Sequence, residues 1–167
     1  MKSGDQFEMV NETFQGGLRN GRRSLVQTAV ADVNYWSIEP NGIRFWGYTD
    51  FTAGVPSSTS VFSSGDVIPL SLKVGETVAI SYTETKTPVS LPAQTIPHQQ
   101  SLVFTGFETL ILGGKTFVDT CRFDSASQPT FQVSWVAKDF GLIKFVDKDA
   151  NGVVVSDDFL SAITAQP

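Results

Sequence analysis

The chain has one cysteine and one histidine, and this scarcity excludes several kinds of site. A single thiol, Cys121, cannot form a disulfide within the chain. One histidine, His98, and one cysteine supply too few nitrogen and sulfur ligands for a zinc site. A catalytic Cys–His pair is not supported either, because His98 lies in a proline-rich segment, TIPHQQ, that nothing connects to Cys121. We therefore predict no metal site and no cofactor.

Charged residues are also few, at 17% of the chain, against about 25% in an average soluble domain. The formal net charge is -5, whereas binding to nucleic acid requires clustered Lys and Arg. The densest basic segment, RNGRR, contains Arg19, Arg22 and Arg23. We interpret it as a solvated hairpin tip, with contact to an anionic lipid or phosphate as the alternative. We expect no nucleic-acid partner.

Long apolar runs are missing as well. No run reaches the length of about 18 residues that a transmembrane helix needs, so no transmembrane segment is predicted. The N-terminal segment, MKSGDQFEMV, lacks the apolar core of a signal peptide. Because the chain passes almost directly into a strand pattern, we expect that a signal was trimmed before Met1 and that the protein belongs in the periplasm or cell envelope.

Strand patterns fill most of the sequence. They cover 7–14, 24–38, 43–51, 67–85, 101–112, 116–123, 131–138, 141–147 and 152–156. The Ser/Gly-rich stretch 52–66 and the proline-rich stretch 86–100 are predicted loops, and only SDDFLSAI (156–163) has a helical pattern. The prediction is an all-β fold: a curved antiparallel meander of about ten strands, forming a half-barrel or open barrel, with one short C-terminal helix. Residues 1–167 are predicted to form a single β domain.

The segment DKDANG (147–152) begins like a calcium-binding loop. Asp147, Asp149 and Asn151 would offer oxygen ligands at alternate positions, and Gly152 would allow the sharp turn. Position 12 of such a loop is normally Glu, but here it is Asp158, and no entering helix precedes the segment. A β-hairpin that turns at Asn151 and Gly152 explains the pattern better, and calcium binding stays the alternative.

No constellation of residues predicts an enzyme. Serines are abundant, but there is no G-x-S-x-G motif. The adjacent Asp157 and Asp158 are explained by capping of the predicted helix. Glu84 and Glu108 lie in separate predicted strands, without a spacing that would pair them. We therefore predict no catalytic residue.

Aromatic residues are the remaining candidates for function, with 13 Phe, 3 Trp and 3 Tyr. Most are expected to form the core. A half-open sheet can also present a concave apolar wall, which suits an acyl chain or a strand of another protein. The residues predicted for such a ligand-binding wall are Trp36, Trp46, Tyr48, Phe104 and Trp135.

Three segments resemble a family of bacterial exported, lipoprotein-like proteins of unknown function. They are VIPLSLKVGETVAISY, GFETLILGGKTFVDTCRF and WVAKDFGLIKF, and the resemblance covers roughly residues 66–160. Gly114, Thr116 and Phe117 occupy the family's turn, with Lys115 inserted, and Gly141 is the expected pivot of the closing hairpin. The resemblance implies a curved antiparallel half-barrel, similar in shape to the lipoprotein carrier proteins, and it brings no catalytic residues.

The favoured hypothesis is a non-enzymatic protein of the cell envelope that binds a lipid or other apolar ligand in a concave sheet face. The first alternative is a structural or interaction module that pairs with another envelope protein through a sheet edge. The second alternative is an uncharacterised hydrolase.

Overall fold

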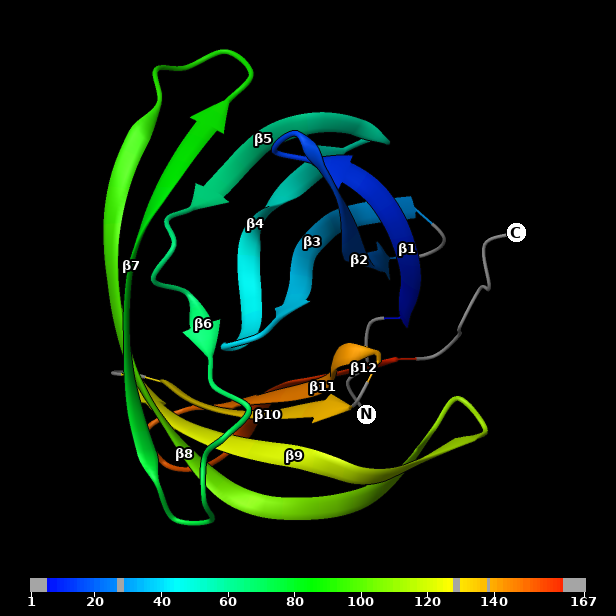
Figure 1. Cartoon of the computed structure of the whole chain (residues 1–167). Helices are drawn as coiled ribbons and strands as arrows, with labels where there is room; N and C mark the ends of the chain where they lie inside the picture. The colour runs from blue at the N-terminus through cyan, green and yellow to red at the C-terminus, as the bar shows by residue number, and fades with distance from the viewer. Residues whose placement is uncertain (1–5, 27–28, 128–129, 138, 161–167) are drawn as a thin grey trace. The chain divides into compact units, whose positions relative to one another are not determined.

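The protein is an all-β chain, as predicted. The computed structural model describes residues 6–26, 29–127, 130–137 and 139–160, and within these ranges it contains strands and turns without a helix (Figure 1). The strands form one antiparallel sheet of twelve, rather than about ten.

The bounds of the strands, in chain order, are β1 (Gln6–Phe14), β2 (Gly17–Val26), β3 (Ala29–Glu39), β4 (Gly42–Thr52), β5 (Val55–Phe62), β6 (Val67–Ile68), β7 (Thr77–Pro88), β8 (Gln94–Leu112), β9 (Lys115–Ser127), β10 (Thr130–Ala137), β11 (Gly141–Lys148) and β12 (Val154–Leu160).

The chain divides into two compact units. Unit 1 consists of Met1–Gln6, Ser71–Ala79 and Gln100–Ala162, and unit 2 consists of Phe7–Leu70, Ile80–Gln99 and Ile163–Pro167. Three of the divisions fall inside strands, one each in β1, β7 and β8. The single domain remains a prediction.

In unit 2, β2, β3, β4, β5 and β7 pair in that order, and β6 adds a short pairing to β4 (Figure 1). A small core lies on one face of β1 to β3, formed by Val10, Phe14, Val33 and Tyr35. The rings of Phe14 and Tyr35 stack with centroids 4.1 Å apart. Gly21 makes this packing feasible, because a Cβ there would lie 2.7 Å from Cγ2 of Val10.

A β-bulge in β4 controls where two aromatic side chains point. Tyr35 pairs with Gly47 and Trp36 pairs with Phe45, so Trp46 is an extra residue on β4. Gly47 has a φ of +133°, and a Cβ there would lie 2.0 Å from the Ser60 carbonyl oxygen. A bulge re-aims the side chains on either side of it. Trp46 consequently packs against the small core, whereas Tyr48 contacts Glu84.

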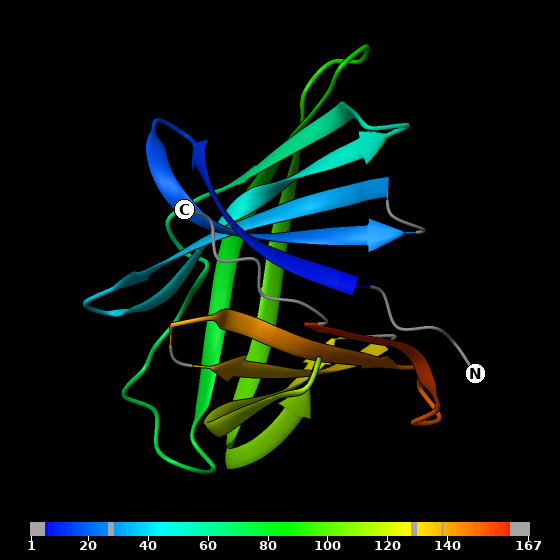
Figure 2. The same cartoon turned by 90° about the vertical axis from the view of Figure 1, so that its right-hand side faces the viewer.

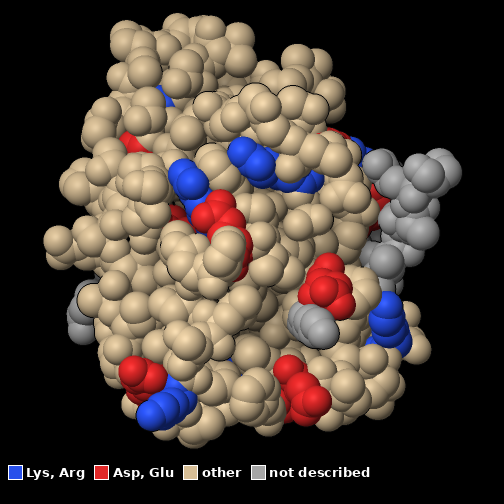
Figure 3. All heavy atoms as spheres, in the orientation of Figure 1, with Lys and Arg blue, Asp and Glu red and all other residues tan. Residues whose placement is uncertain are grey.

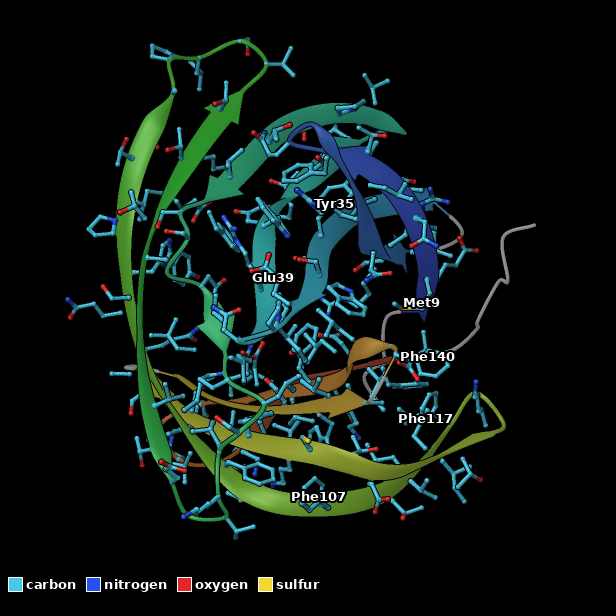
Figure 4. All side chains as sticks on the ribbon, viewed as in Figure 1. Met9, Tyr35, Glu39, Phe107, Phe117 and Phe140 are labelled. Atoms are coloured by element: carbon cyan, nitrogen blue, oxygen red, sulfur yellow. The ribbon has the colours of Figure 1, made fainter. Side chains whose placement is uncertain are left out.

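In unit 1, β8 to β12 pair in sequence order, and the yellow-to-red strands lie side by side in Figure 2. Phe104 and Phe123 are cross-strand partners and both are buried. Phe117 and Phe140, labelled in Figure 4, meet edge to face with centroids 5.4 Å apart. Gly141 has a φ of +67°, which favours glycine and agrees with its expected role as a pivot.

The predicted C-terminal helix is wrong in its described part. Ser156–Leu160 belongs to β12, which pairs with β11 through Phe145 and Asp158 and through Lys144 and Phe159. The ladder supplies the backbone hydrogen bonds that a helix would make internally. The Ser156 hydroxyl donates to Asp147 on the neighbouring strand β11. Residues 161–163 lie outside the described residues.

Three predicted turns or loops are also largely strand. The Ser-rich stretch 52–66 contains β5, the proline-rich stretch 86–100 lies mostly in β7 and β8, and RNGRR lies inside β2. In β5, the buried hydroxyls of Ser58 and Ser60 donate to Asp50 and Glu84. Serines that bond to carboxylates across the sheet therefore replace the apolar residues by which a buried strand is usually recognised.

Candidate functional site

The five aromatic residues predicted for a ligand wall are distributed over both units. Trp36, Trp46 and Tyr48 belong to unit 2, and Phe104 and Trp135 belong to unit 1. Trp36 and Phe104 are only 2% and 3% exposed, so their rings pack in the protein interior. The other three are half-buried and each makes a polar contact through its ring nitrogen or hydroxyl. Ligand binding by these residues stays a prediction.

A buried carboxylate in unit 2 is the centre of a polar group that we call the Glu84 cluster: Tyr48, Ser60, Glu84 and His98. Glu84 is 5% exposed. Its Oε1 accepts hydrogen bonds from the Tyr48 hydroxyl at 2.9 Å and the Ser60 hydroxyl at 2.6 Å. Its Oε2 lies 2.7 Å from Nε2 of His98. Both oxygens of the carboxylate are therefore bonded.

Strand register brings the cluster together from four neighbouring strands. Tyr48 on β4 pairs with Ser60 on β5, and Phe62, two residues further along β5, pairs with Glu84 on β7. Residues two apart on a strand share a face, so Ser60 and Glu84 point to the same side. His98 comes from β8, the neighbour of β7.

The hydrogen bonds keep Glu84 ionised despite its burial. Burial alone would raise the pKa of Glu84, but the hydrogen bonds from Ser60, Tyr48 and His98 outweigh it, and the pKa is lowered. Burial, partly opposed by the hydrogen bond with Ser60, raises the pKa of Tyr48. An ionised Glu84 accepts hydrogen bonds only, so His98 donates through Nε2–H.

The rings around this carboxylate form a continuous series, which we call the aromatic row: Tyr48, Phe62, Tyr82 and His98. Successive ring centroids lie 5.9 Å, 4.8 Å and 4.8 Å apart, and the last pair is stacked at 14°. All four side chains are half-buried. The row thus places partly exposed ring surface across β4, β5, β7 and β8.

Asp66 lies near the aromatic row in a different electrostatic state. It is 4% exposed, and burial raises its pKa to about 7. Its charge in turn contributes to raising the pKa of Tyr82, for which burial is the larger cause. Burial is the only cause that shifts the pKa of Asp66, whereas three hydrogen bonds lower the pKa of Glu84. A buried carboxyl group without such hydrogen bonds is ionised less readily.

Unit 1 contains a comparable but more exposed group, the Glu108 cluster: Glu108, Arg122, Asp124 and Trp135. The Trp135 indole nitrogen donates to Glu108 at 2.7 Å, and Arg122 donates to Glu108 at 3.0 Å and to Asp124 at 2.9 Å. The hydrogen bond from Trp135 is the largest cause that lowers the pKa of Glu108. Its charges are paired within the cluster.

The DKDANG segment forms the predicted hairpin between β11 and β12. The Gly152 amide donates to the Asp149 carbonyl, and the Asp149 amide donates to the Val153 carbonyl. Oδ1 of Asp149 accepts the backbone amides of Asn151 and Val153, each at 2.9 Å. Within the described ranges, no group of three or more His, Cys, Asp and Glu side chains is arranged to hold a metal ion.

Sequence reasoning did not bring Glu84 and His98 together, although a signal for both exists. Ile80, Tyr82 and Glu84 alternate along β7, which places Glu84 on the same face as a buried isoleucine. His98 alternates with Leu102 in β8 in the same way. A charged or titratable residue at an inward position of an alternating strand is thus a sequence signal for a buried polar site.

No family model, no curated protein and no solved structure matches this chain. The candidate site therefore stands on the chain's own geometry.

On the face drawn in Figure 3, basic and acidic atoms form small, scattered groups among other residues. No helix in the part of the chain that the structure describes is long and apolar enough to cross a membrane.

Proposed function

We propose that this protein is a non-enzymatic binding protein and that the aromatic row of unit 2 contacts an apolar ligand. One observation carries the proposal. Two polar atoms of the terminal rings, the Tyr48 hydroxyl and Nε2 of His98, are bonded to Glu84. What these rings still offer a ligand is mainly their apolar surface.

The physical chemistry of the row favours a flat or flexible apolar ligand. Aromatic side chains provide large apolar contact areas with few rotatable bonds. The hydrogen bonds to Glu84 fix the orientation of the two terminal rings before binding, which lowers the entropy cost of association. A lipid chain or an aromatic small molecule fits these properties.

The same contacts give little support to catalysis. The Ser60 hydroxyl is 0% exposed and donates to a carboxylate rather than to a histidine base. A nucleophile needs access to substrate and an adjacent base that accepts its proton. Glu84 is committed to three donors and is kept ionised, so it is a poor general acid.

The location in the cell envelope and the half-barrel or open-barrel arrangement are part of the proposal. They rest on the low charge content and on the resemblance of three segments to exported, lipoprotein-like proteins.

A fluorescent, uncharged apolar probe such as N-phenyl-1-naphthylamine tests the aromatic row directly. We expect saturable fluorescence enhancement with the wild-type protein and about tenfold weaker binding after Phe62→Ala, because a central ring of the row is removed.

Native mass spectrometry of protein purified from its own envelope would identify the natural ligand by its retained mass.

Phe107→Ala is the matched control, because Phe107 is a 62% exposed phenylalanine on β8 of unit 1 and lies outside the row. We expect it to bind the probe like the wild type. Equal losses in the two variants, or no saturable binding by the folded wild type, would refute the aromatic row as the site. A copurified protein in place of a small molecule would favour the interaction module.

A further inference from the structure

The indole of Trp46 in unit 2 carries an arginine on each face. Cζ of Arg19 lies 3.8 Å from the ring centroid and Cζ of Arg44 lies 3.6 Å from it. Two guanidinium groups so close to one centroid would collide if they shared a face, so they occupy opposite faces. We call Arg19, Trp46 and Arg44 the Trp46 stack.

Gly17 leaves room beside the backbone for the guanidinium of Arg19. A Cβ on Gly17 would lie 2.8 Å from Cζ of Arg19 and 2.7 Å from its Nη1. Glycine at this position therefore leaves the space that the guanidinium fills, between the chain and the indole. The bulge in β4 presents Trp46 to this space, and the Ser37 hydroxyl accepts the indole N–H at 2.8 Å.

The positive charge of the stack is only weakly compensated. Arg44 lies 3.8 Å from Glu39, the residue labelled at the end of β3 in Figure 4. Arg19 donates to the Leu18 carbonyl at 3.4 Å, and no carboxylate among the described residues forms an ion pair with it. By contrast, the neighbouring Arg23 pairs with both Glu8 and Glu12.

Part of each guanidinium is also desolvated without compensation. The Nε atoms of Arg19 and Arg44 are buried and have no hydrogen-bond partner within the described part of the chain. A charge that has lost water on one side is attracted more strongly to an anion on its open side. The two arginines thus keep N–H donors for a ligand while their ring-facing surfaces are held by Trp46.

We propose that the Trp46 stack is a binding site for a phosphate group. A stacked guanidinium has its N–H donors at its edge, where they form paired hydrogen bonds with oxyanions. A planar carboxylate is satisfied by one such edge, whereas a tetrahedral phosphate has enough oxygens to bridge two arginines. The inference does not depend on the apolar ligand proposed above, because it uses a different set of side chains.

NMR titration of the 167-residue chain tests the site. The probes are inorganic phosphate and, separately, dihexanoyl phosphatidylglycerol below its micelle concentration, both at constant ionic strength. We expect saturable shifts of the Trp46 indole and of arginine Nε–H signals. Arg19→Gln and Arg44→Gln should each weaken binding about tenfold, the effect of losing one charge-assisted hydrogen-bonding partner. Gly17→Ala should act in the same direction by displacing the Arg19 guanidinium.

Arg122→Gln is the matched control. Arg122 also lies beside a tryptophan, with Cζ 5.7 Å from the Trp135 ring, but it is paired with Glu108 and Asp124. The substitution removes the same charge, so binding should be unchanged if the effect is local. Saturation by inorganic phosphate would identify a free-phosphate site, and saturation by the lipid alone would identify a head-group site.

Two results would overturn the proposal: no saturable shift with either probe, or equal losses in Arg19→Gln and Arg122→Gln. Glu39→Gln keeps the test decisive if the arginine variants fail to fold. It removes the carboxylate that competes for Arg44, so phosphate affinity should rise several-fold. Unchanged or weaker binding by a folded Glu39→Gln protein would also reject the site.

Discussion

Glu84 of unit 2 and Glu108 of unit 1 have similar partners in different surroundings. Each accepts a hydrogen bond from an aromatic side chain, Tyr48 or Trp135, and each accepts another from a nitrogen donor, His98 or Arg122. The Glu84 side chain is 7% exposed, whereas the Glu108 side chain is 38% exposed. The two glutamates differ most in how far they are buried.

Burial changes how many donors a carboxylate needs. Both pKa values are lowered, but for Glu84 burial is the largest single contribution and acts in the opposite direction. The hydroxyl of Ser60 supplies a third donor to Glu84 that helps to offset the lost hydration. Glu108 keeps part of its water and is held by two partners.

The largest expected effect is that of Glu84→Gln, which should lower the free energy of unfolding by about 3 kcal/mol at pH 7, because it breaks a buried charged network. Urea denaturation of the variant and the wild type measures this. The folded-state pKa of Glu84 lies below its ordinary value of 4.5, so its contribution is present above that pH and is lost as pH falls through the folded pKa. The unfolding free energies of the two proteins should therefore become equal at acidic pH. A constant difference at all pH values would contradict the assigned charge.

Asp66→Asn should have a smaller effect of opposite sign. The folded pKa of Asp66 is about 7 and its ordinary value is 3.8, so the wild type loses stability as pH rises between these values. The neutral amide avoids this loss, and we expect a gain of about 2 kcal/mol at pH 8. Thermal or urea unfolding of Asp66→Asn and the wild type at pH 4 and pH 8 tests this prediction. The gain in stability should nearly vanish at pH 4. Destabilisation at pH 8 would show that Asp66 is ionised and satisfied.

Glu108→Gln should have the smallest effect, below about 1 kcal/mol at pH 7, because exposed ion pairs contribute little. Added salt should shrink the difference further, because it screens exposed charges. Urea unfolding at low and high salt measures both effects. A loss as large as that of Glu84→Gln would mean that burial is not what separates the two glutamates.

The sequence predicted the parts of the fold that depend on local alternation. The all-β class, the hairpin at Asn151 and Gly152, and the turn at Gly141 follow from side-chain period and from residues that tolerate positive φ. The stretch Ser156–Leu160 was misassigned, because its helix-like cap pattern is overridden by pairing with β11. That pairing depends on a partner strand, which a local pattern does not contain.

The candidate sites divide in the same way. The inward position of Glu84 could have been predicted from alternation along β7. The Trp46 stack could not, because it depends on one extra residue in β4 relative to β3, which changes the direction of an indole. A bulge is a property of two paired strands, and Trp46 and Gly47 alone do not reveal it.

The division of the chain also sets the order in which its parts become available during synthesis. Every described residue of unit 2 precedes Gln100, so the four members of the Glu84 cluster are translated before β9 to β12. Unit 1 must wait for the last third of the chain, while its Ser71–Ala79 segment is made early. An interrupted translation product that ends after His98 would therefore contain all four residues of the Glu84 cluster but, of unit 1, little more than Ser71–Ala79.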